Sequence, residues 1–143
     1  MRRFIHQVSL AVAVYLFLGA AVVSAQSSTR LVGDIPFEFH VGQATLPSGE
    51  YTVKSGYPTA DTICIQSKDR SRSAMVQTIP FSPGKEGGVA KLVFNRYGSD
   101  YFLSQVWNPS ESIVRELNKS KLEMEVARKV REAQATEVAL RKH

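Results

Sequence analysis

Few residues of this chain could carry acid–base chemistry. Of its three histidines, only His40 and His143 lie beyond the apolar N-terminal stretch, and His143 is the last residue. His40 alternates with apolar residues in a strand-like run, so we expect it to face solvent with Glu38 on the same side. A general base needs a positioned partner, and Glu38 could supply one. A surface His–Glu neighbour pair without catalytic function is the simpler interpretation.

Other residue types that support catalysis or metal binding occur without a recognisable spacing. The sequence has no Gly-x-Ser-x-Gly, no His-Glu-x-x-His and no paired Cys and His positions. A typical zinc site needs about four ligands, which these histidines and one cysteine cannot supply. Glycoside hydrolysis needs two carboxylates, but nothing singles out a pair among those available. We therefore predict no catalytic residue, no metal site and no cofactor. The available carboxylates include Asp34, Glu38, Glu50, Asp61, Asp69 and Asp100.

One short segment has a charge pattern suited to binding. Lys68, Arg70 and Arg72 alternate with polar residues between two strand-like runs. A basic turn of this kind could form an interaction surface for an anionic polymer or lipid. The alternative is a solvated hairpin tip that binds nothing.

The cysteine and several aromatic residues have both a functional and a structural interpretation. Cys64 has no partner for an internal disulfide and lies in an apolar run, so we expect a small buried side chain rather than a reactive thiol. Tyr57, Tyr97, Tyr101 and Trp107 could line a carbohydrate platform, but such residues more often form core and cross-strand pairs.

The elements that would position these residues are mostly strands. Residues 35–41 alternate apolar and polar side chains with period two, as a strand with one buried face does. A Leu-Pro-Ser-Gly turn follows, and a second alternation begins at Tyr51. Residues 91–96 and 101–107 form the clearest predicted hairpin, around a Gly-Ser turn. In that register Phe94 faces Leu103 and Arg96 faces Tyr101.

A helix is predicted after the β region of residues 26–109. Ser120 and Glu123 have the spacing of a capping box, and no glycine or proline follows them. We therefore predict a C-terminal helical segment over residues 110–143, whose first half docks through one apolar stripe. The predicted fold is mainly β: an antiparallel β-sandwich or partly open barrel of about six or seven strands with one C-terminal α-helix. The stripe comprises Leu122, Val126, Val130 and Ala133.

The N-terminal segment has the composition of an export signal. Arg2 and Arg3 precede an uncharged apolar run that ends in a Val-Ser-Ala site, as signal peptides do. We predict a signal peptide over residues 1–25, cleaved between Ala25 and Gln26, and export by the general secretory route to the periplasm or the extracellular space. The alternative is a retained anchor, although the run is shorter than the roughly 20 residues that span a bilayer.

The net charge of the chain bears on whether its partner could be a nucleic acid. Removal of the predicted signal peptide takes away two of the 18 Lys and Arg residues and none of the 13 Asp and Glu residues, so the net charge falls from +5 to about +3. This excess is too small to indicate nucleic-acid binding, and we expect no nucleic-acid partner.

The motif F-x-F-x-V-G-x-x-x-L-P-x-G-x-Y-T-V, over residues 37–53, and residues 91–98 and 101–107 resemble an uncharacterised family of small secreted bacterial β-rich proteins. The shorter L-P-x-G-x-Y-x-V run also resembles the turn and strand of prealbumin-like sandwich modules, such as carboxypeptidase regulatory-like domains. The first resemblance implies a shared fold and export. That family carries no established activity, so the resemblance implies no site residues.

These observations predict a non-enzymatic structural or interaction module of the cell envelope or periplasm. Its partner would be an envelope protein or polymer, held at the basic turn or the C-terminal helix. One alternative is a carrier of a small ligand or lipid, and another is a hydrolase built on His40, Glu38 and a nucleophile or on two carboxylates. The carrier cavity would be lined by Phe37, Phe39, Phe94 and Leu103.

Overall fold

The computed structural model describes residues 29–56, 58–84, 88–130 and 134–143. The predicted signal peptide, its cleavage site at Ala25 and Gln26, and also Tyr57 and Ala133, lie outside these residues. The described chain is mainly β with one α-helix near its C-terminal end, as predicted.

Within the described residues, eleven strands make up one sheet. They are β1 (Arg30–Ile35), β2 (Phe39–Val41), β3 (Ala44–Leu46), β4 (Gly49–Ser55), β5 (Thr62–Ser67), β6 (Ser73–Phe81), β7 (Lys91–Tyr97), β8 (Asp100–Asn108), β9 (Ile113–Leu117), β10 (Gln134–Ala139) and β11 (Arg141–Lys142). A short 3-10 helix, η1 (Pro109–Glu111), precedes β9, and helix α2 (Lys121–Lys129) lies between β9 and β10. The strands outnumber the six or seven expected, because the predicted strand over residues 35–41 is divided and because β9, β10 and β11 lie in the segment predicted to be helical.

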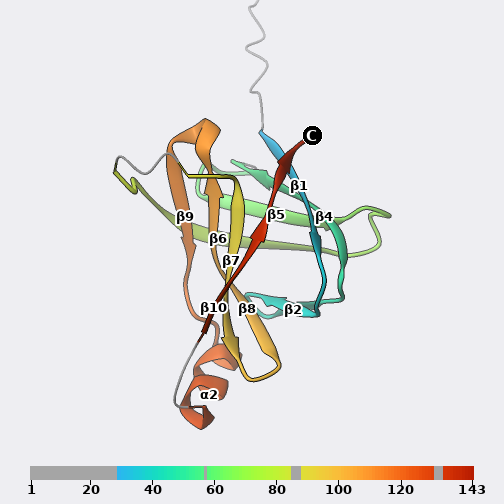
Figure 1. Cartoon of the computed structure of the whole chain (residues 1–143), viewed down its shortest axis with the longest axis vertical. Helices are drawn as coiled ribbons and strands as arrows, with labels where there is room; N and C mark the ends of the chain where they lie inside the picture. Colours follow the sequence, from blue (N-terminus) through green and yellow to red (C-terminus); the bar gives the residue numbers. More distant parts are fainter. Residues whose placement is uncertain (1–28, 57, 85–87, 131–133) are drawn as a thin grey trace, which may run out of the picture.

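The sheet is open but its two ends are joined by one segment of chain. Its strand order is β10-β7-β8-β9-β6-β5-β4-β1-β11, with β2 and β3 attached beside β8. The end strands β10 and β11 follow one another along the chain, with only Leu140 between them. Figure 1 shows this red segment crossing from the side of α2 to β1. All strand pairs are antiparallel except β2 and β8, which meet in parallel at His40 and Phe102.

The predicted strand over residues 35–41 is divided in two. β1 ends at Ile35 and β2 begins only at Phe39. Pro36 lies between them and has no N–H to donate to a neighbouring strand. Within β1, Gly33 allows a close approach, because a Cβ atom there would lie 2.5 Å from Leu140 Cδ2. The C-terminal segment can therefore pack directly on β1.

The inward side chains of the alternating strands form the core. Phe39 and Phe94 are fully buried and meet edge to face, with ring centroids 5.6 Å apart. Tyr51 meets Phe39 in the same way at 5.1 Å. The alternation seen in residues 35–53 thus gives a buried face, as predicted. Phe37 is only partly buried and stacks on Tyr101 at 3.8 Å.

The predicted hairpin of β7 and β8 is confirmed in its register. Phe94 faces Leu103 and Arg96 faces Tyr101. An irregularity between Val93 and Phe94 shifts the register beyond that point. Phe102 and Leu103 are both buried although they are adjacent in the chain, so β8 is covered on both faces there.

The predicted helical segment over residues 110–143 contains more strand than helix and is corrected here. Only Lys121–Lys129 form an α-helix, and residues 113–117, 134–139 and 141–142 are strands of the sheet. Pairing with β7 and β1 determines the conformation of the last two, because an open strand edge offers backbone partners that override local helix propensity.

Helix α2 docks through a carboxylate rather than through the predicted apolar stripe. Ser120 caps the helix by accepting a hydrogen bond from the Glu123 N–H, 3.1 Å, as the capping box predicts. The buried Glu123 side chain accepts hydrogen bonds from Asn95 Nδ2, 2.9 Å, and the Tyr97 hydroxyl, 3.1 Å. Burial of the Tyr97 side chain is the main reason that its pKa is raised, and the nearby Glu123 carboxylate raises it further. Leu122 of the predicted stripe is 37% exposed.

Candidate binding pocket

The turn that leads into β4 is closed by its own tyrosine. The Tyr51 hydroxyl donates a 2.6 Å hydrogen bond to the Pro47 carbonyl oxygen, four residues earlier. The ring lies beneath the turn and is almost fully buried, and this burial raises the pKa of the phenol. Gly49 has φ 153°, which a residue with a side chain rarely adopts. The spacing Pro-x-Gly-x-Tyr therefore folds this turn locally.

The β5–β6 turn is held by one carboxylate oxygen. Asp69 Oδ1 accepts hydrogen bonds from Ser67 Oγ, 2.6 Å, from the Ser71 N–H, 3.0 Å, and from Ser71 Oγ, 2.7 Å. These three hydrogen bonds lower the pKa of Asp69 from 3.8 to about 2, and the bond from the Ser67 hydroxyl has the largest effect. Arg70 has φ 62°, the left-handed conformation that a tight turn needs. The turn is therefore ordered and carries its basic side chains outward.

A hydrogen bond and a shared acidic residue join the two turns. The Lys68 N–H donates to the Glu50 carbonyl oxygen at 3.0 Å. The Glu50 carboxylate lies 2.9 Å from Arg141 Nη2 and 3.5 Å from Lys68 Nζ. The hydrogen bond from Arg141 is the main reason that the pKa of Glu50 is lowered. Arg141 comes from β11, so the C-terminal segment also supports this site.

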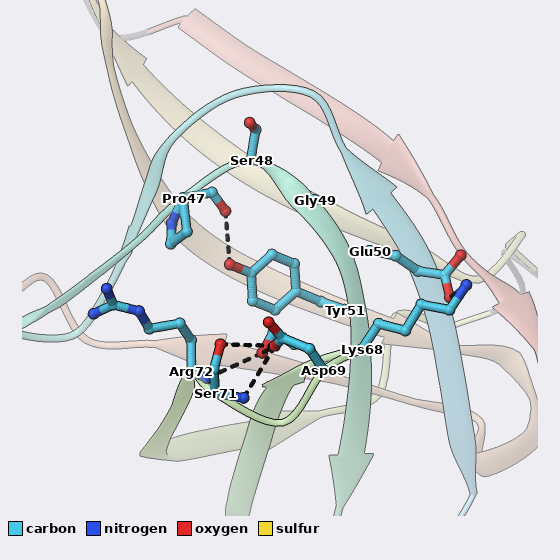
Figure 2. A pocket seen from close by; sticks show the side chains of 10 residues that line it. Pro47, Ser48, Gly49, Glu50, Tyr51, Lys68, Asp69, Ser71 and Arg72 are labelled. Carbon is cyan, nitrogen blue, oxygen red and sulfur yellow. Dashed lines mark hydrogen bonds and ion pairs between the residues drawn. The ribbon is translucent and has the colours of Figure 1, made fainter.

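A pocket of about 410 Å³ lies between the two turns. In Figure 2 the Tyr51 ring lies in the middle, with Asp69 and Ser71 below it, while Arg72 extends toward Pro47. Lys68 points away from Arg72, toward Glu50. We call this set of residues the turn pocket. It is lined by Pro47, Ser48, Gly49, Glu50, Tyr51, Ser67, Lys68, Asp69, Ser71 and Arg72.

The basic residues predicted as an interaction surface divide around this pocket. Lys68 and Arg72 line it, whereas Arg70 belongs to the same turn but not to the lining. Both Lys68 and Arg72 are exposed. Glu50 and Asp69, two of the available carboxylates, also line the pocket, but each is engaged with neighbouring donors. The arrangement presents charged and hydroxyl groups that could bind a ligand.

His40 has partners other than the predicted one. Its Nδ1 lies 2.9 Å from Thr45 Oγ1, its Nε2 lies 3.9 Å from Asp100, and its ring stacks on Phe102 with centroids 4.5 Å apart. Its side chain is only 13% exposed, so the expected solvent-facing position is wrong. These contacts tie β2 and β3 to β8. Nothing in the alternation of residues 35–41 indicates a partner as distant as Asp100.

The remaining sequence candidates lie apart from one another. Cys64 is paired with Met75 on the outer side of β5 and β6 and is only partly buried, because Ile63 and Ile65 take the core positions. The expectation of a buried Cys64 was therefore wrong. No cluster of three His, Cys, Asp or Glu side chains that could hold a metal ion occurs within the described ranges.

The residues expected to line a carrier cavity pack against one another. Phe37 meets Phe94 edge to face at 5.1 Å, and Phe94 also contacts Phe39. Leu103 is buried opposite Phe94 in the β7–β8 hairpin. These side chains contribute to the hydrophobic core, whereas the turn pocket lies elsewhere.

Comparison of the chain with protein-family models, with curated proteins and with solved structures found no match. Within the part of the chain that the structure describes, no helix is long and apolar enough to cross a membrane. The site therefore has to be interpreted from its own chemistry.

Proposed function

We propose that this protein is an exported, non-enzymatic interaction module of the cell envelope or periplasm, and that it holds an envelope polymer or protein at the turn pocket. The observation that carries the proposal is the pocket itself. Two ordered turns, one at the start of β4 and one at the end of β5, converge on a concave surface with two exposed basic side chains. Export rests on the N-terminal composition, and the uncharacterised secreted family that the sequence resembles supports it.

The rigidity of the turns supports binding. Each turn is held by side-chain hydrogen bonds to its own backbone or hydroxyls, through Tyr51 in one and Asp69 in the other. A preorganised surface loses little conformational entropy when a partner binds. Lys68 and Arg72 would attract an anionic partner from a turn whose backbone is already ordered.

The test is sedimentation of the mature protein with the insoluble envelope fraction of the cell that produces it. We expect the wild type to sediment and the triple variant K68Q/R70Q/R72Q to bind at least about tenfold more weakly, since binding depends on these charges. The matched control K119Q/K121Q/R128Q removes the same charge from the exposed surface near and on α2, and should bind like the wild type.

Two results would contradict the proposal. One is a wild-type protein that stays in the supernatant at low ionic strength. The other is an equal loss in both triple variants, which would mean that only net charge matters. N-terminal sequencing of the secreted chain tests export separately, and a first residue of Gln26 is expected.

A further inference from the structure

We infer that the turn pocket binds a carboxylate-bearing sugar residue, as found in an acidic polysaccharide. This inference rests on the proposed function, because it takes the turn pocket as the binding site and names the chemical class of its ligand. Size is the first argument. A volume of about 410 Å³ falls in the range of roughly 300–1,000 Å³ that small-ligand sites occupy, and it suits one or two sugar rings.

The second argument is the unpaired guanidinium of Arg72. Its backbone N–H donates to Ser67 Oγ at 3.0 Å, but its side chain has no hydrogen-bond or ion-pair partner within the described residues. By contrast, Lys68 and Arg141 both lie against Glu50. A guanidinium presents a planar fork of N–H donors that matches a carboxylate with two parallel hydrogen bonds. Arg72 is therefore the group that would hold the acidic end of a ligand.

The third argument is the acceptor that Asp69 provides, in the same turn as Arg72. Asp69 uses Oδ1 for all three of its turn hydrogen bonds, and Oδ2 has no partner among the residues that the structure describes. An ionised carboxylate can only accept hydrogen bonds. The pocket thus combines a free donor fork on Arg72 with a free acceptor on Asp69, and it adds the hydroxyl of Ser48, which can do both.

This combination favours an acidic sugar over a simple anion. Inorganic phosphate at neutral pH carries only one or two hydroxyl groups, so it offers Asp69 few hydrogen-bond donors. A sugar acid offers a carboxylate to Arg72 and several hydroxyl donors to Asp69. The C-terminus of a peptide offers a carboxylate and backbone N–H donors, but it lacks the several hydroxyl groups of a sugar, which can both donate and accept. The pocket chemistry therefore points to polyhydroxylated acids.

The experiment is calorimetric titration of the mature chain with a galacturonic acid disaccharide, and with the galactose disaccharide as the neutral match. We expect the acidic sugar to bind at least about tenfold more tightly than the neutral one. R72Q should abolish that preference. R128Q makes the same charge change on α2, outside the pocket lining, and it should leave the preference intact.

Several outcomes would overturn the inference. An equal effect of R128Q and R72Q would show long-range attraction without a site. Tighter binding of inorganic phosphate, or of acetyl-dialanine with a free carboxylate, would assign the pocket to another ligand class. Failure here differs from failure of the proposed function. If the triple variant loses envelope binding while the wild type shows no preference for the acidic over the neutral sugar, only the ligand class is wrong.

Discussion

Tyr51 determines the geometry of one wall of the turn pocket. Its ring anchors the turn in the core and its hydroxyl satisfies the Pro47 carbonyl oxygen. The residue types of this turn were visible in the sequence, and so was its position before a strand. The contact with the β5–β6 turn was not visible, because it depends on pairing between strands β4 and β5. The contact of Arg141 with this site could not be predicted either, because the sequence pattern predicts a helix where β11 lies.

Replacing Tyr51 with Phe should destabilise the protein by about 1 kcal/mol, because the Pro47 carbonyl loses its hydrogen-bond donor near the core. Urea unfolding of the two proteins measures the difference. Tyr101→Phe is the matched control, since the Tyr101 hydroxyl has no hydrogen-bond partner in the described part of the chain. A loss in the control as large as that in Y51F would remove the assigned role of the hydroxyl.

Asp69 should make stability depend on pH in a narrow acidic range. Its pKa in the folded protein, about 2, is below its ordinary value of 3.8. The stabilisation is therefore present above about pH 4 and is lost as the pH falls toward 2. The free energy of unfolding of the wild type and of D69N, measured from pH 2 to pH 6, should differ most at pH 6 and converge at pH 2. A difference that stays constant over this range would contradict the assignment.

Among the elements, the strands were easier to predict than the helix. The β7–β8 hairpin combines a glycine turn with a matching register, so local information determines it. Helix α2 begins where its capping box predicts but ends at Lys129. The residues of the next strand, β10, which include Thr136 and Val138, do not form a clear strand pattern. Only the pairing of β10 with β7 distinguishes it from a continued helix.

Glu123→Ala should loosen α2 and destabilise the fold by about 1–3 kcal/mol, because Asn95 and Tyr97 would lose their shared acceptor. Chemical unfolding gives the size of the effect. Glu125→Ala, at an exposed position on the same helix, should change stability by less than about 0.5 kcal/mol. If both variants behave alike, the carboxylate does not anchor the helix.

At the scale of the whole molecule, the C-terminal segment holds the sheet together. β10 pairs with β7 along six residues, Gln134 to Ala139, while β11 pairs with β1 at Leu31 and Val32. Between them the Leu140 N–H donates to the Ala90 carbonyl oxygen at 2.8 Å, and its side chain is buried beside Gly33. The fold class could be predicted from alternation, but this connection could not, because its partners lie at opposite ends of the sequence.

Leu140→Ala should cost about 2–5 kcal/mol, the usual range for a buried leucine replaced by alanine. Thermal or urea unfolding followed by near-UV circular dichroism measures this loss. Leu122→Ala removes the same atoms from a side chain that is 37% exposed and should cost much less. Equal effects would mean that the segment between β10 and β11 contributes little to holding the sheet.

The pairing of β1 with β11 also has a consequence for the timing of folding. Leu31 meets Lys142, so one of the first described strands cannot acquire this partner until the last one has been synthesised. Contacts so distant in sequence form slowly, because a long loop must close before they are made. Until β11 has been made, the outer edge of β1 stays unpaired, and its free backbone groups could pair with a strand of another chain.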